Sequence, residues 1–435
     1  MSTPVADWDD VALRDFGEIV AGGTPSRTNP SLWNGGIPWL TLSGVSALRG
    51  KFVRETAETI SPEGLAGSAA RLLPVGSIMV TTRATIGEVA IAGVPLATNQ
   101  GFKNIVPNEN TDSLFAYYAI QTINRQMLSL ASGTTFLEIS KADFSRIGTR
   151  RPKRDEQRRI AAVLDTVDDA TAATEATIEK LRQVRQGLLH DLLTRGLDEN
   201  GELRDPVAHP EQFKDSPFGL IPKEWEVERL DDIAASAVDG PFGSNLKTEH
   251  YVALPGVRVV RLQNIDTGRF NHTDKAYVSE EHARMLSRHQ VMRGDLLVAS
   301  MGDENHPFAR ACLYPDELSP GLVKADCFRL RMRSELAVNG YVMHFLNCPS
   351  TRHEVQTLGQ GVTRDRVNLT TLLTLRVSRP HVEEQKEIVK QVDALDRVVA
   401  AEQQARASLM QLRSGLLLDL LSGRVRVPGI IGGAP

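Results

Sequence analysis

The chain contains one helix-forming stretch twice, and this repeat limits the folds that it can adopt. Residues 181–193 have the sequence LRQVRQGLLHDLL and residues 409–421 have LMQLRSGLLLDLL, with nine of thirteen positions identical. The match continues toward the N-terminus at the same offset of 228, because DEQRRIAAVLDTVDD at 155 corresponds to EEQKEIVKQVDALDR at 383. Similarity at a fixed offset indicates that one structural unit is present twice.

Further landmarks extend the repeat over most of each half. One set matches at an offset of 217 and another, just before each helix, at 228. Between these landmarks the two halves differ strongly, so a common frame surrounds two variable bodies. The pairs are Trp8, Leu13 and Phe16 with Trp225, Leu230 and Ile233, and Gly133, Thr135, Ile139, Phe144, Ile147, Arg151 and Pro152 with Gly361, Thr363, Val367, Leu372, Leu375, Arg379 and Pro380.

Each repeated helix has recognisable ends. Pro152 and Pro380 disfavour helical geometry in the residues before them, and the acidic residues that follow favour a helix start through the helix dipole. Gly196 and Gly423 stand where helices commonly stop. Each helix should run for about 40 residues, or roughly 60 Å at 1.5 Å per residue. The predicted spacer helices are 153–196 and 381–424, with Asp155, Glu156, Glu383 and Glu384 as the acidic residues.

Apolar residues recur at heptad spacing along both helices and form a seam. A seam of this length needs a partner helix, and the nearest candidate is the duplicate. A duplicated unit is most simply closed by a pseudo-twofold axis, so we predict an antiparallel coiled coil; the alternative is two unrelated surface helices. The seam residues are Ile160, Val163, Val167, Ala170, Ile178, Leu181, Val184 and Leu188 in the first helix and Ile388, Leu395, Val398, Ala405, Leu409, Leu412 and Leu416 in the second.

The remaining segments form two bodies of mixed type. Short strands bounded by glycine are predicted at GSIMVTTR, GEVAIAG, GVRVVRLQNI and GDLLVASM. One helix is predicted in each body, at 111–132 and at 338–358. The fold class is therefore α+β, with two pseudo-twofold-related globular domains separated by two long antiparallel helices. The domains are 1–152 and 223–380, with an ordered linker at 197–222 and a tail at 425–435.

Composition excludes several classes of protein. The 435 residues suffice for two to three domains. No stretch suits a membrane helix, the polar start is unlike a secretory signal, and three cysteines without CxxC spacing predict reduced thiols of a cytoplasmic protein. The net charge of −4 gives no basic footprint of the kind that nucleic-acid binders usually carry. DNA binding would therefore need local patches or help from a partner.

Catalytic motifs are absent from the sequence. It has no GxxxxGK[ST] loop, no GxGxxG after a strand, no HExxH, no GxSxG and no Asn or Asp before a Pro-Pro pair. The His353-Glu354 pair lacks a second histidine, and EEQK at 383 is better explained by helix capping. We therefore predict a protein that is not an enzyme and that binds no metal or cofactor of its own.

Loops rich in hydrogen-bonding residues follow the predicted strands. They are GGTPSRTN at 22, TTRATIG at 81, TNQGF at 98 and SGTTF at 132, then GPFGSNLK at 240, LQNI at 262, SMGDEN at 300 and GQGVTRDR at 359. Arg, Asn, Gln and Lys pair with base edges, whereas Ser, Thr and glycine-rich backbone hold phosphates. Each loop alone is explained as an ordinary turn, but together they predict a two-site DNA reader. The candidate DNA-binding residues are Thr24, Ser26, Arg27, Thr82, Arg83, Asn99, Gln100, Thr135, Ser244, Asn245, Lys247, Asn264, Thr363, Arg364 and Arg366.

This layout resembles the specificity (S) subunit of type I restriction–modification systems. The resemblance covers nearly the whole chain and rests on GGTPS at 22–26, VTTRATIG at 80–87, TNQGF at 98–102 and GLIPKEW at 219–225. The RP…EQ…I entry to each helix and the exits GLLHDLLTRG and GLLLDLLSGRV carry it further. The second body departs from the TTRATIG pattern, because ASMGDENHPFARACL is longer and lacks the same arginine–glycine spacing.

The resemblance implies a non-catalytic subunit in which each body reads half of a split sequence in double-stranded DNA. The helices would set the spacing and dock two methyltransferase subunits, which bring S-adenosylmethionine and flip the target adenine, and a motor-nuclease subunit would bring ATP and Mg. No membrane is involved. The alternatives are a degenerate methyltransferase or nuclease and a two-headed protein-binding scaffold. Residues assigned to the subunit interface are Ile160, Val167, Leu181, Leu188, Ile388, Leu395, Leu409 and Leu416.

Overall fold

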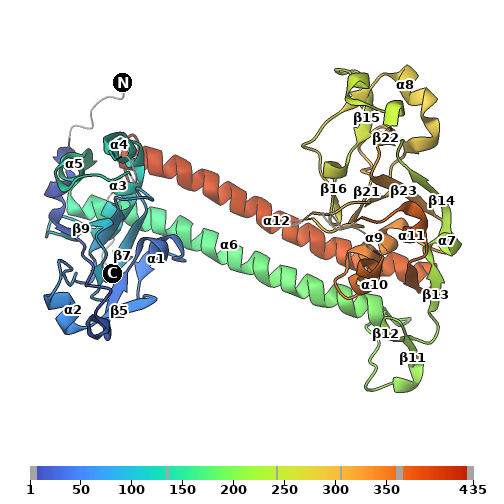
Figure 1. Ribbon diagram of the computed structural model, residues 1–435, viewed down its shortest axis with the longest axis horizontal. Helices are drawn as coiled ribbons and strands as arrows, with labels where there is room; N and C mark the ends of the chain where they lie inside the picture. The colour runs from blue at the N-terminus through green and yellow to red at the C-terminus, as the bar shows by residue number, and fades with distance from the viewer. Residues whose placement is uncertain (1–6, 134–136, 242, 304–305, 359–365, 429–435) are drawn as a thin grey trace. The chain divides into compact units, whose positions relative to one another are not determined.

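The computed structural model describes residues 7–428 apart from 134–136, 242, 304–305 and 359–365, and apart from the side chain of Ser244 (Figure 1). The chain divides into two compact units, Met1–Glu175 with Gln404–Pro435 and Ala176–Gln403. Both division points fall inside long helices, so each unit contains one body and one half of each helix. No helix in the described part of the chain is long and apolar enough to cross a membrane.

Two long helices have the ends that the sequence predicts. They are α6 (Arg154–Thr194) and α12 (Val382–Leu421), and each has two acidic residues in its first turn. Gly196 and Gly423 follow their C-termini in the left-handed region, with φ of +64° and +74°. At Gly196 a Cβ atom would lie 2.4 Å from the ring of Trp225, so the close packing there also requires glycine.

The two helices run antiparallel in each unit, as predicted. In both units, residues farther along α6 and the turn after it contact residues that come earlier in α12, as antiparallel packing requires. The contacts are Asp168–Arg413 and Glu175–Arg406 in the first unit, and Arg185–Asp396 and Leu197–Glu384 in the second.

A glutamate in the first turn of each helix, buried in the first unit and nearly buried in the second, joins that start to the segment after the other helix. In the first unit, Glu156 accepts two hydrogen bonds from Arg426, of 2.5 and 2.8 Å. In the second unit, Glu384 accepts from Arg204 at 2.7 Å and from the indole of Trp225 at 3.1 Å. Sequence reasoning assigned these carboxylates to the helix dipole alone and did not reveal their arginine partners.

The first body contains two main sheets. Their strand orders are β2-β9-β6-β7-β4 and β5-β3-β8, and a separate pair, β1 with β10, closes the body near α6. The strands are β1 (Asp9–Ala12), β2 (Gly17–Ala21), β3 (Trp33–Leu40), β4 (Phe52–Val53), β5 (Glu58–Ile60), β6 (Ile78–Thr81), β7 (Val89–Ala92), β8 (Ala97–Thr98), β9 (Phe102–Pro107) and β10 (Gly148–Arg151). The helices are α1 (Leu42–Ser46), α2 (Pro62–Ala66), α3 (Ser113–Thr122), α4 (Asn124–Leu130) and α5 (Lys141–Arg146).

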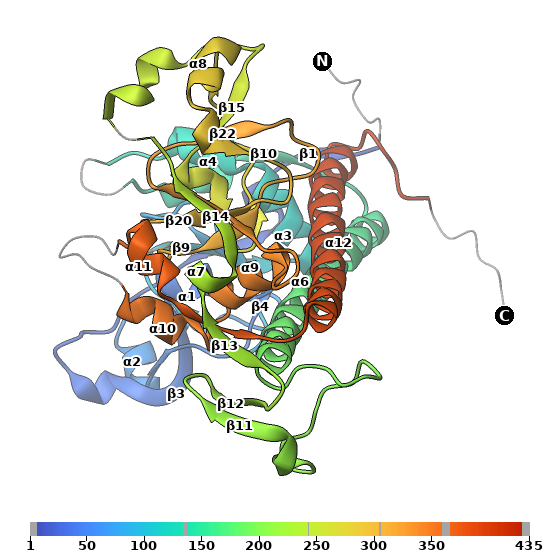
Figure 2. The same cartoon turned by 90° about the vertical axis from the view of Figure 1, so that its right-hand side faces the viewer.

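The second body repeats this arrangement. Its sheets have the orders β14-β23-β20-β21 and β18-β15-β22-β19, and β13 pairs with β24. Helix α8 packs beside β15 and β22 (Figure 2). The strands are β13 (Glu226–Arg229), β14 (Ala234–Asp239), β15 (Val257–Val260), β16 (Ile265–Asp266), β17 (Arg269–Phe270), β18 (Tyr277–Val278), β19 (Gln290–Val291), β20 (Leu296–Ala299), β21 (Ala311–Leu313), β22 (Gly321–Val323), β23 (Cys327–Met332) and β24 (Arg376–Arg379). The helices are α7 (Leu230–Ile233), α8 (Glu280–Met285), α9 (Asn339–Asn347), α10 (Arg352–Thr357) and α11 (Leu369–Leu373).

Strand register proves the two bodies equivalent at their frames. Asp9 pairs with Arg151 in the first body, and Glu226 pairs with Arg379 in the second. These partners are related by the offsets of 217 and 228 found in the sequence. The segment 197–222 also belongs to the folded structure, because it forms the hairpin of β11 (Phe213–Ser216) and β12 (Gly219–Pro222) and buries Ile221.

Two predictions about helices were wrong in detail. The single helix expected at 111–132 is broken at Ile123 into α3 and α4, and the one expected at 338–358 is broken into α9 and α10. Pro349 explains the second break, since proline disfavours helical geometry at Cys348. The first break has no comparable residue.

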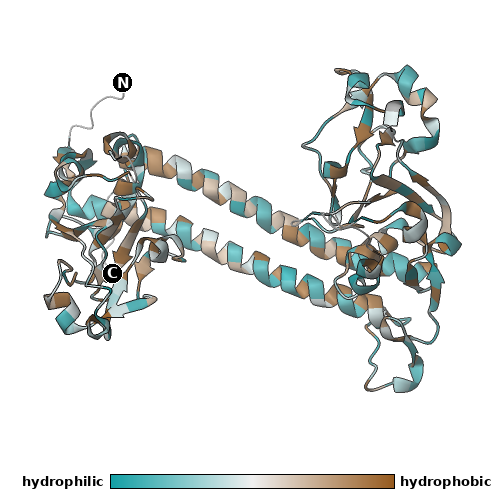
Figure 3. Ribbon diagram, viewed as in Figure 1, coloured by the Kyte–Doolittle hydropathy of each residue, from teal (hydrophilic) through white to brown (hydrophobic). Residues whose placement is uncertain are grey.

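The apolar seam is also less continuous than predicted. Figure 3 shows hydrophobic and hydrophilic residues interleaved along both helices. Val184 and Leu412, which occupy matching positions of the repeat, are each 50% exposed, and Val398 is 47% exposed. These residues were placed in the seam because heptad spacing does not distinguish the inner edge of an apolar stripe from its outer edge.

A buried glutamine holds each helix to its own body. Gln157 donates to the carbonyls of Pro152 and Asn110 and accepts from the N–H of Asp112. Its duplicate, Gln385, donates to Pro380 and Leu336 and accepts from Val338 in the same way. Both glutamines are buried, with exposures of 1% and 0%. The EQ of each helix entry is therefore a structural clamp.

Replacing Gln385 with alanine should lower the free energy of unfolding by about 1–3 kcal/mol, because buried backbone groups lose their partners. Chemical denaturation of the full chain measures this change. Gln411→Ala, at an exposed position of α12, is the control and should change stability by less than about 0.5 kcal/mol. Equal changes in the free energy of unfolding for the two variants would contradict a stabilising role for Gln385.

A fragment of residues 1–201 should form a symmetric dimer. In the full chain, Ile160 and Leu164 pack with Leu416 and Leu420, whose duplicates on α6 are Leu188 and Leu192. A second copy can therefore supply the same apolar surface, worth roughly 1.5–3 kcal/mol for each buried side chain.

Arg185 of the other copy would likewise take the place of Arg413 opposite Asp168 in this dimer. Sedimentation equilibrium should find a dimer, and Leu192→Asp should abolish it. A well-folded monomer of the unsubstituted fragment would contradict the idea that α6 of a second copy can replace α12.

Candidate nucleic-acid interface

The predicted loops of the first body meet at one place. The N–H of Thr82 donates to the carbonyl of Gly101 at 2.8 Å, and the N–H of Ile139 donates to the carbonyl of Thr82 at 2.9 Å. The N–H of Gly23 donates to the carbonyl of Thr98 at 2.9 Å. The loops beginning at 22, 81 and 98 and the segment at 137–139 thus lie beside one another. Their meeting follows from the sheet, in which β6 and β9 are neighbours.

The second body brings its loops together with the same hydrogen bonds. The N–H of Ser300 donates to the carbonyl of Asp326 at 3.0 Å, and the N–H of Val367 donates to the carbonyl of Ser300 at 2.9 Å. Loop 240–247 joins them through the N–H of Gly240, which donates to the carbonyl of Cys327 at 3.1 Å. The backbone hydrogen bonds at Thr82, Gly101 and Ile139 therefore recur at Ser300, Asp326 and Val367, where the side chains differ.

Glu138 lies between two cations on the surface of the first body. Its carboxylate is 3.7 Å from Nε of Arg83 and 3.4 Å from Nζ of Lys103. Arg83 and Glu138 are each about 40% exposed, at 39% and 40%, whereas Lys103 is nearly buried at 8%. Sequence reasoning selected Arg83 but missed Glu138 and Lys103, since neither belongs to a motif; their signal is the strand pairing that places them together.

The equivalent position in the second body carries an arginine. Arg366 forms a backbone bridge with Met301, as Glu138 does with Arg83. The Arg366 guanidinium donates to Asp326 at 2.8 Å, and its side chain is 48% exposed. An exposed guanidinium held from one side by a carboxylate retains donors for a further acceptor.

Arg27 is fixed by its own surroundings. Its guanidinium donates two hydrogen bonds to Glu58, of 2.7 and 2.9 Å, and lies 3.8 Å from the ring centroid of Trp33. The hydrogen bonds to Glu58 raise the pKa of Arg27 despite an opposing effect of burial. Arg27 therefore has fewer free donors than its exposure suggests.

Other candidates in the first body are accessible. Thr24 donates to the side-chain oxygen of Gln100, and Ser26 lies 2.8 Å from the hydroxyl of Thr28. Asn99 uses its side-chain oxygen to accept from the N–H of Gly101. Gln100 and Ser26 are exposed, while Thr24 and Asn99 are half-buried.

In the second body, Asn245 and Lys247 are exposed. The backbone carbonyl of Asn245 lies 2.9 Å from Nε2 of His282, and Nζ of Lys247 lies 3.4 Å from Glu249. The backbone at Asn245 is thus held, while the side chains of Asn245 and Lys247 are exposed.

Four predicted interface residues are fully buried, and the structure corrects their assignment. Thr82 is fully buried and its hydroxyl donates to the carbonyl of Gly101. Asn264 is fully buried and donates to the carbonyls of Asn271 and Asp274. Neither can contact DNA in this conformation. Ile160 and Ile388 are fully buried in the cores of their own units and cannot contact another subunit.

The remaining predicted residues have various positions. Val167 is 9% exposed, Leu188 and Leu416 pack partly against the cores, and Leu181, Leu395 and Leu409 are half-buried. Thr135, Thr363 and Arg364 lie outside the described residues, as does the side chain of Ser244.

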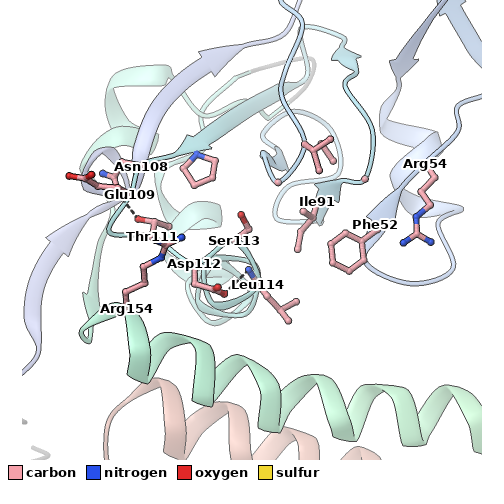
Figure 4. A pocket seen from close by; sticks show the side chains of 15 residues that line it. Phe52, Arg54, Ile91, Asn108, Glu109, Thr111, Asp112, Ser113, Leu114 and Arg154 are labelled. Carbon is pink, nitrogen blue, oxygen red and sulfur yellow. Dashed lines mark hydrogen bonds between the residues drawn. The ribbon is translucent and has the colours of Figure 1, made fainter.

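A pocket of about 600 Å³ lies elsewhere on the first body, beside α3 and the start of α6 (Figure 4). Phe52, Ile91 and Leu114 supply an apolar wall, and Arg154 extends from α6. None of the predicted DNA-binding residues that the structure describes lines it. Within the described residues there is also no group of three or more His, Cys, Asp and Glu side chains placed to hold a metal ion.

Comparison with known proteins identifies the family. A family model described as the type I restriction modification DNA specificity domain matches residues 6–183 and 222–411. The chain belongs to this family. The two matches correspond to the two halves of the repeat, and the specificity-domain family therefore includes both bodies and most of both helices.

Individual relatives agree with this assignment. The type I restriction enzyme MjaIX specificity subunit of Methanocaldococcus jannaschii is 31% identical over 266 residues, which cover 60% of this chain and 59% of that protein. The MjaVIII specificity subunit of the same organism is 22% identical over 430 residues, covering 98% and 94%. The type I restriction-modification S subunit from M. genitalium has the same fold, with a TM-score of 0.56 and 16% identity over 97% of this chain and 98% of that one.

Removing the Glu138 charge should strengthen non-specific DNA binding. In Glu138→Gln, Arg83 and Lys103 lose their shared carboxylate, so the loop surface becomes more positive. Affinity for random duplex should rise several-fold at low salt, and the slope of log K against log salt should steepen by about 1. Fluorescence anisotropy measures both. Glu109→Gln, exposed on the same body away from these loops, should change affinity less, and equal changes would contradict a role for Glu138 at the interface.

Proposed function

We propose that this type I restriction–modification specificity subunit reads a bipartite sequence in double-stranded DNA, one half with each body. The supporting observation is that two bodies of different sequence use the same backbone hydrogen bonds to assemble their loops, at Thr82, Gly101 and Ile139 and at Ser300, Asp326 and Val367. A constant frame with variable loops suits a protein that applies one binding geometry to two different half-sites.

The first half-site would be read chiefly by Arg83, Asn99 and Gln100, and the second by Asn245, Lys247 and Arg366. These side chains carry the donors and acceptors that pair with base edges. Thr24, Ser26 and Arg27 would position the body on the phosphate backbone, because serine and threonine hydroxyls and arginine commonly contact phosphate oxygens.

Partner subunits would complete the activity. The net charge of −4 is unsuited to holding DNA through phosphates alone, so two methyltransferase subunits would supply most phosphate contacts. They would dock on the helices, where Val184, Val398 and Leu412 expose apolar surface. They would also bind S-adenosylmethionine, and a motor-nuclease subunit would bind ATP and Mg. The complex would act in the cytoplasm, where it meets DNA.

Half-site variants test this division of labour. With the partner subunits present, Arg83→Ala should relax one base position in one half-site, and Arg366→Ala one position in the other. Each loss of a base contact should cost about 1–3 kcal/mol, or roughly 5- to 150-fold in affinity. Methylation mapping over randomised duplexes measures both effects. Arg14→Ala, an exposed arginine outside the loops, is the control.

The result also separates the alternatives. Uniform weakening on all sequences would assign both arginines to phosphate contacts. Absence of any DNA binding by the complex would favour a protein-binding scaffold.

A further inference from the structure

In the first unit, one lysine connects the body to the helix pair. Lys51, just before β4, hydrogen-bonds to Asp165 and lies 3.2 Å from Asp168, both on α6. Asp168 also accepts from the hydroxyl of Tyr118 at 2.8 Å and from Arg413 on α12. Side chains from the sheet, from α3 and from both long helices therefore meet at one carboxylate.

The network is charged although it is partly buried. The Lys51 side chain is only 10% exposed, and burial alone would lower its pKa, but Asp165 and Asp168 outweigh that effect and the pKa is raised. Burial would likewise raise the pKa of Asp168, yet hydrogen bonds from Arg413 and Tyr118 lower it. Removing the lysine would leave two carboxylates without their shared cation.

The repeat places an equivalent set in the second unit. Gly-Arg-Phe at 268–270 matches Gly-Lys-Phe at 50–52, so Arg269 takes the place of Lys51. Asp393 and Asp396 match Asp165 and Asp168 at the offset of 228, and Arg185 matches Arg413. The N–H of Asp112 and the N–H of Val338 make the same hydrogen bond to the two glutamines, so these residues are equivalent. This equivalence aligns α3 with α9 and places His344 where the first unit has Tyr118.

The second set does not form the same network, because Arg269 does not pair with Asp393 or Asp396. Asp396 is paired with Arg185, at 2.9 Å for one of the two bonds, and Asp393 lies 3.5 Å from Nε2 of His344. The side chain of Arg269 is exposed and forms no hydrogen bond or ion pair with any residue that the structure describes. A cleft of about 660 Å³ separates the β16–β17 hairpin from the helices, and Arg269, His344 and Asp396 line it.

We propose that the two bodies are attached to the helices by unequal joints: Lys51 fixes the first body, whereas the second body, held by the Gln385 contacts and the shared core, can rock about them over the open cleft. Lys51 is a positioning residue in this scheme. Only the consequence for DNA rests on the proposed function: the second body would change its angle to fit its half-site, while the first body would fix the position of the protein along the DNA.

Paired spin labels at equivalent positions of the two units test the proposal. Cysteines at Val75 and Asp169 label the first unit, and cysteines at Arg293 and Arg397 label the second; all four positions are exposed. The native cysteines Cys312, Cys327 and Cys348 are buried and should not react. Without DNA, the distance distribution in the second unit should be at least about twice as wide as in the first.

Variants of the joint give the decisive comparison. Lys51→Met should widen the first distribution, and Arg269→Met, its matched control, should leave the second unchanged. The double variant Arg269→Lys with His344→Tyr rebuilds the first set in the second unit and should narrow the second distribution. Equal widths in the unsubstituted chain, or no widening by Lys51→Met in a protein whose circular dichroism is native, would overturn the proposal. Neither outcome depends on whether the chain binds DNA.

Discussion

The carboxylates of Glu156, which is buried, and Glu384, which is nearly buried, are the constraint on which the frame depends. Each stands in the first turn of one long helix and is paired with an arginine from the segment that follows the other helix. A buried carboxylate without such a partner is strongly destabilising, so each helix start requires the other helix to end beside it. The antiparallel packing, the glycine turns at Gly196 and Gly423, and the glutamine clamps are consistent with this requirement.

Much of the fold could be predicted from the sequence because the repeat supplies a comparison that a single sequence normally lacks. Matching landmarks gave the two bodies, the helix ends and the antiparallel packing, and strand register confirmed the offsets at Asp9 and Glu226. The errors arose where local pattern was the only guide. Heptad spacing placed Val184 and Leu412 in the seam although half of each side chain faces solvent, and hydrophobic helical pattern did not reveal the break at Ile123.

The candidate site was harder to predict because loop composition does not report burial. Thr82 and Asn264 have the same residue types as the accessible candidates Thr24 and Asn245, yet both form their hydrogen bonds inside the body. Glu138 and Lys103 carry no motif and become noticeable only when β6, β9 and the loop ending at Ile139 are placed together. Whether a side chain near a predicted loop is buried or exposed therefore depends on tertiary structure, which comparison of the two repeats does not reveal.

The division of the chain also determines the order in which it can fold during synthesis. The second unit, Ala176–Gln403, is continuous in sequence, whereas the first is assembled from Met1–Glu175 and Gln404–Pro435. A nascent chain emerges from its N-terminus, so the continuous unit can be complete while the other still lacks Arg413, Leu420 and Arg426. During that interval the part of α6 that packs with Leu416 and Leu420 lacks those partners and is open to aggregation or to chaperones. The unit whose residues are synthesised first is thus the last that can complete its folding.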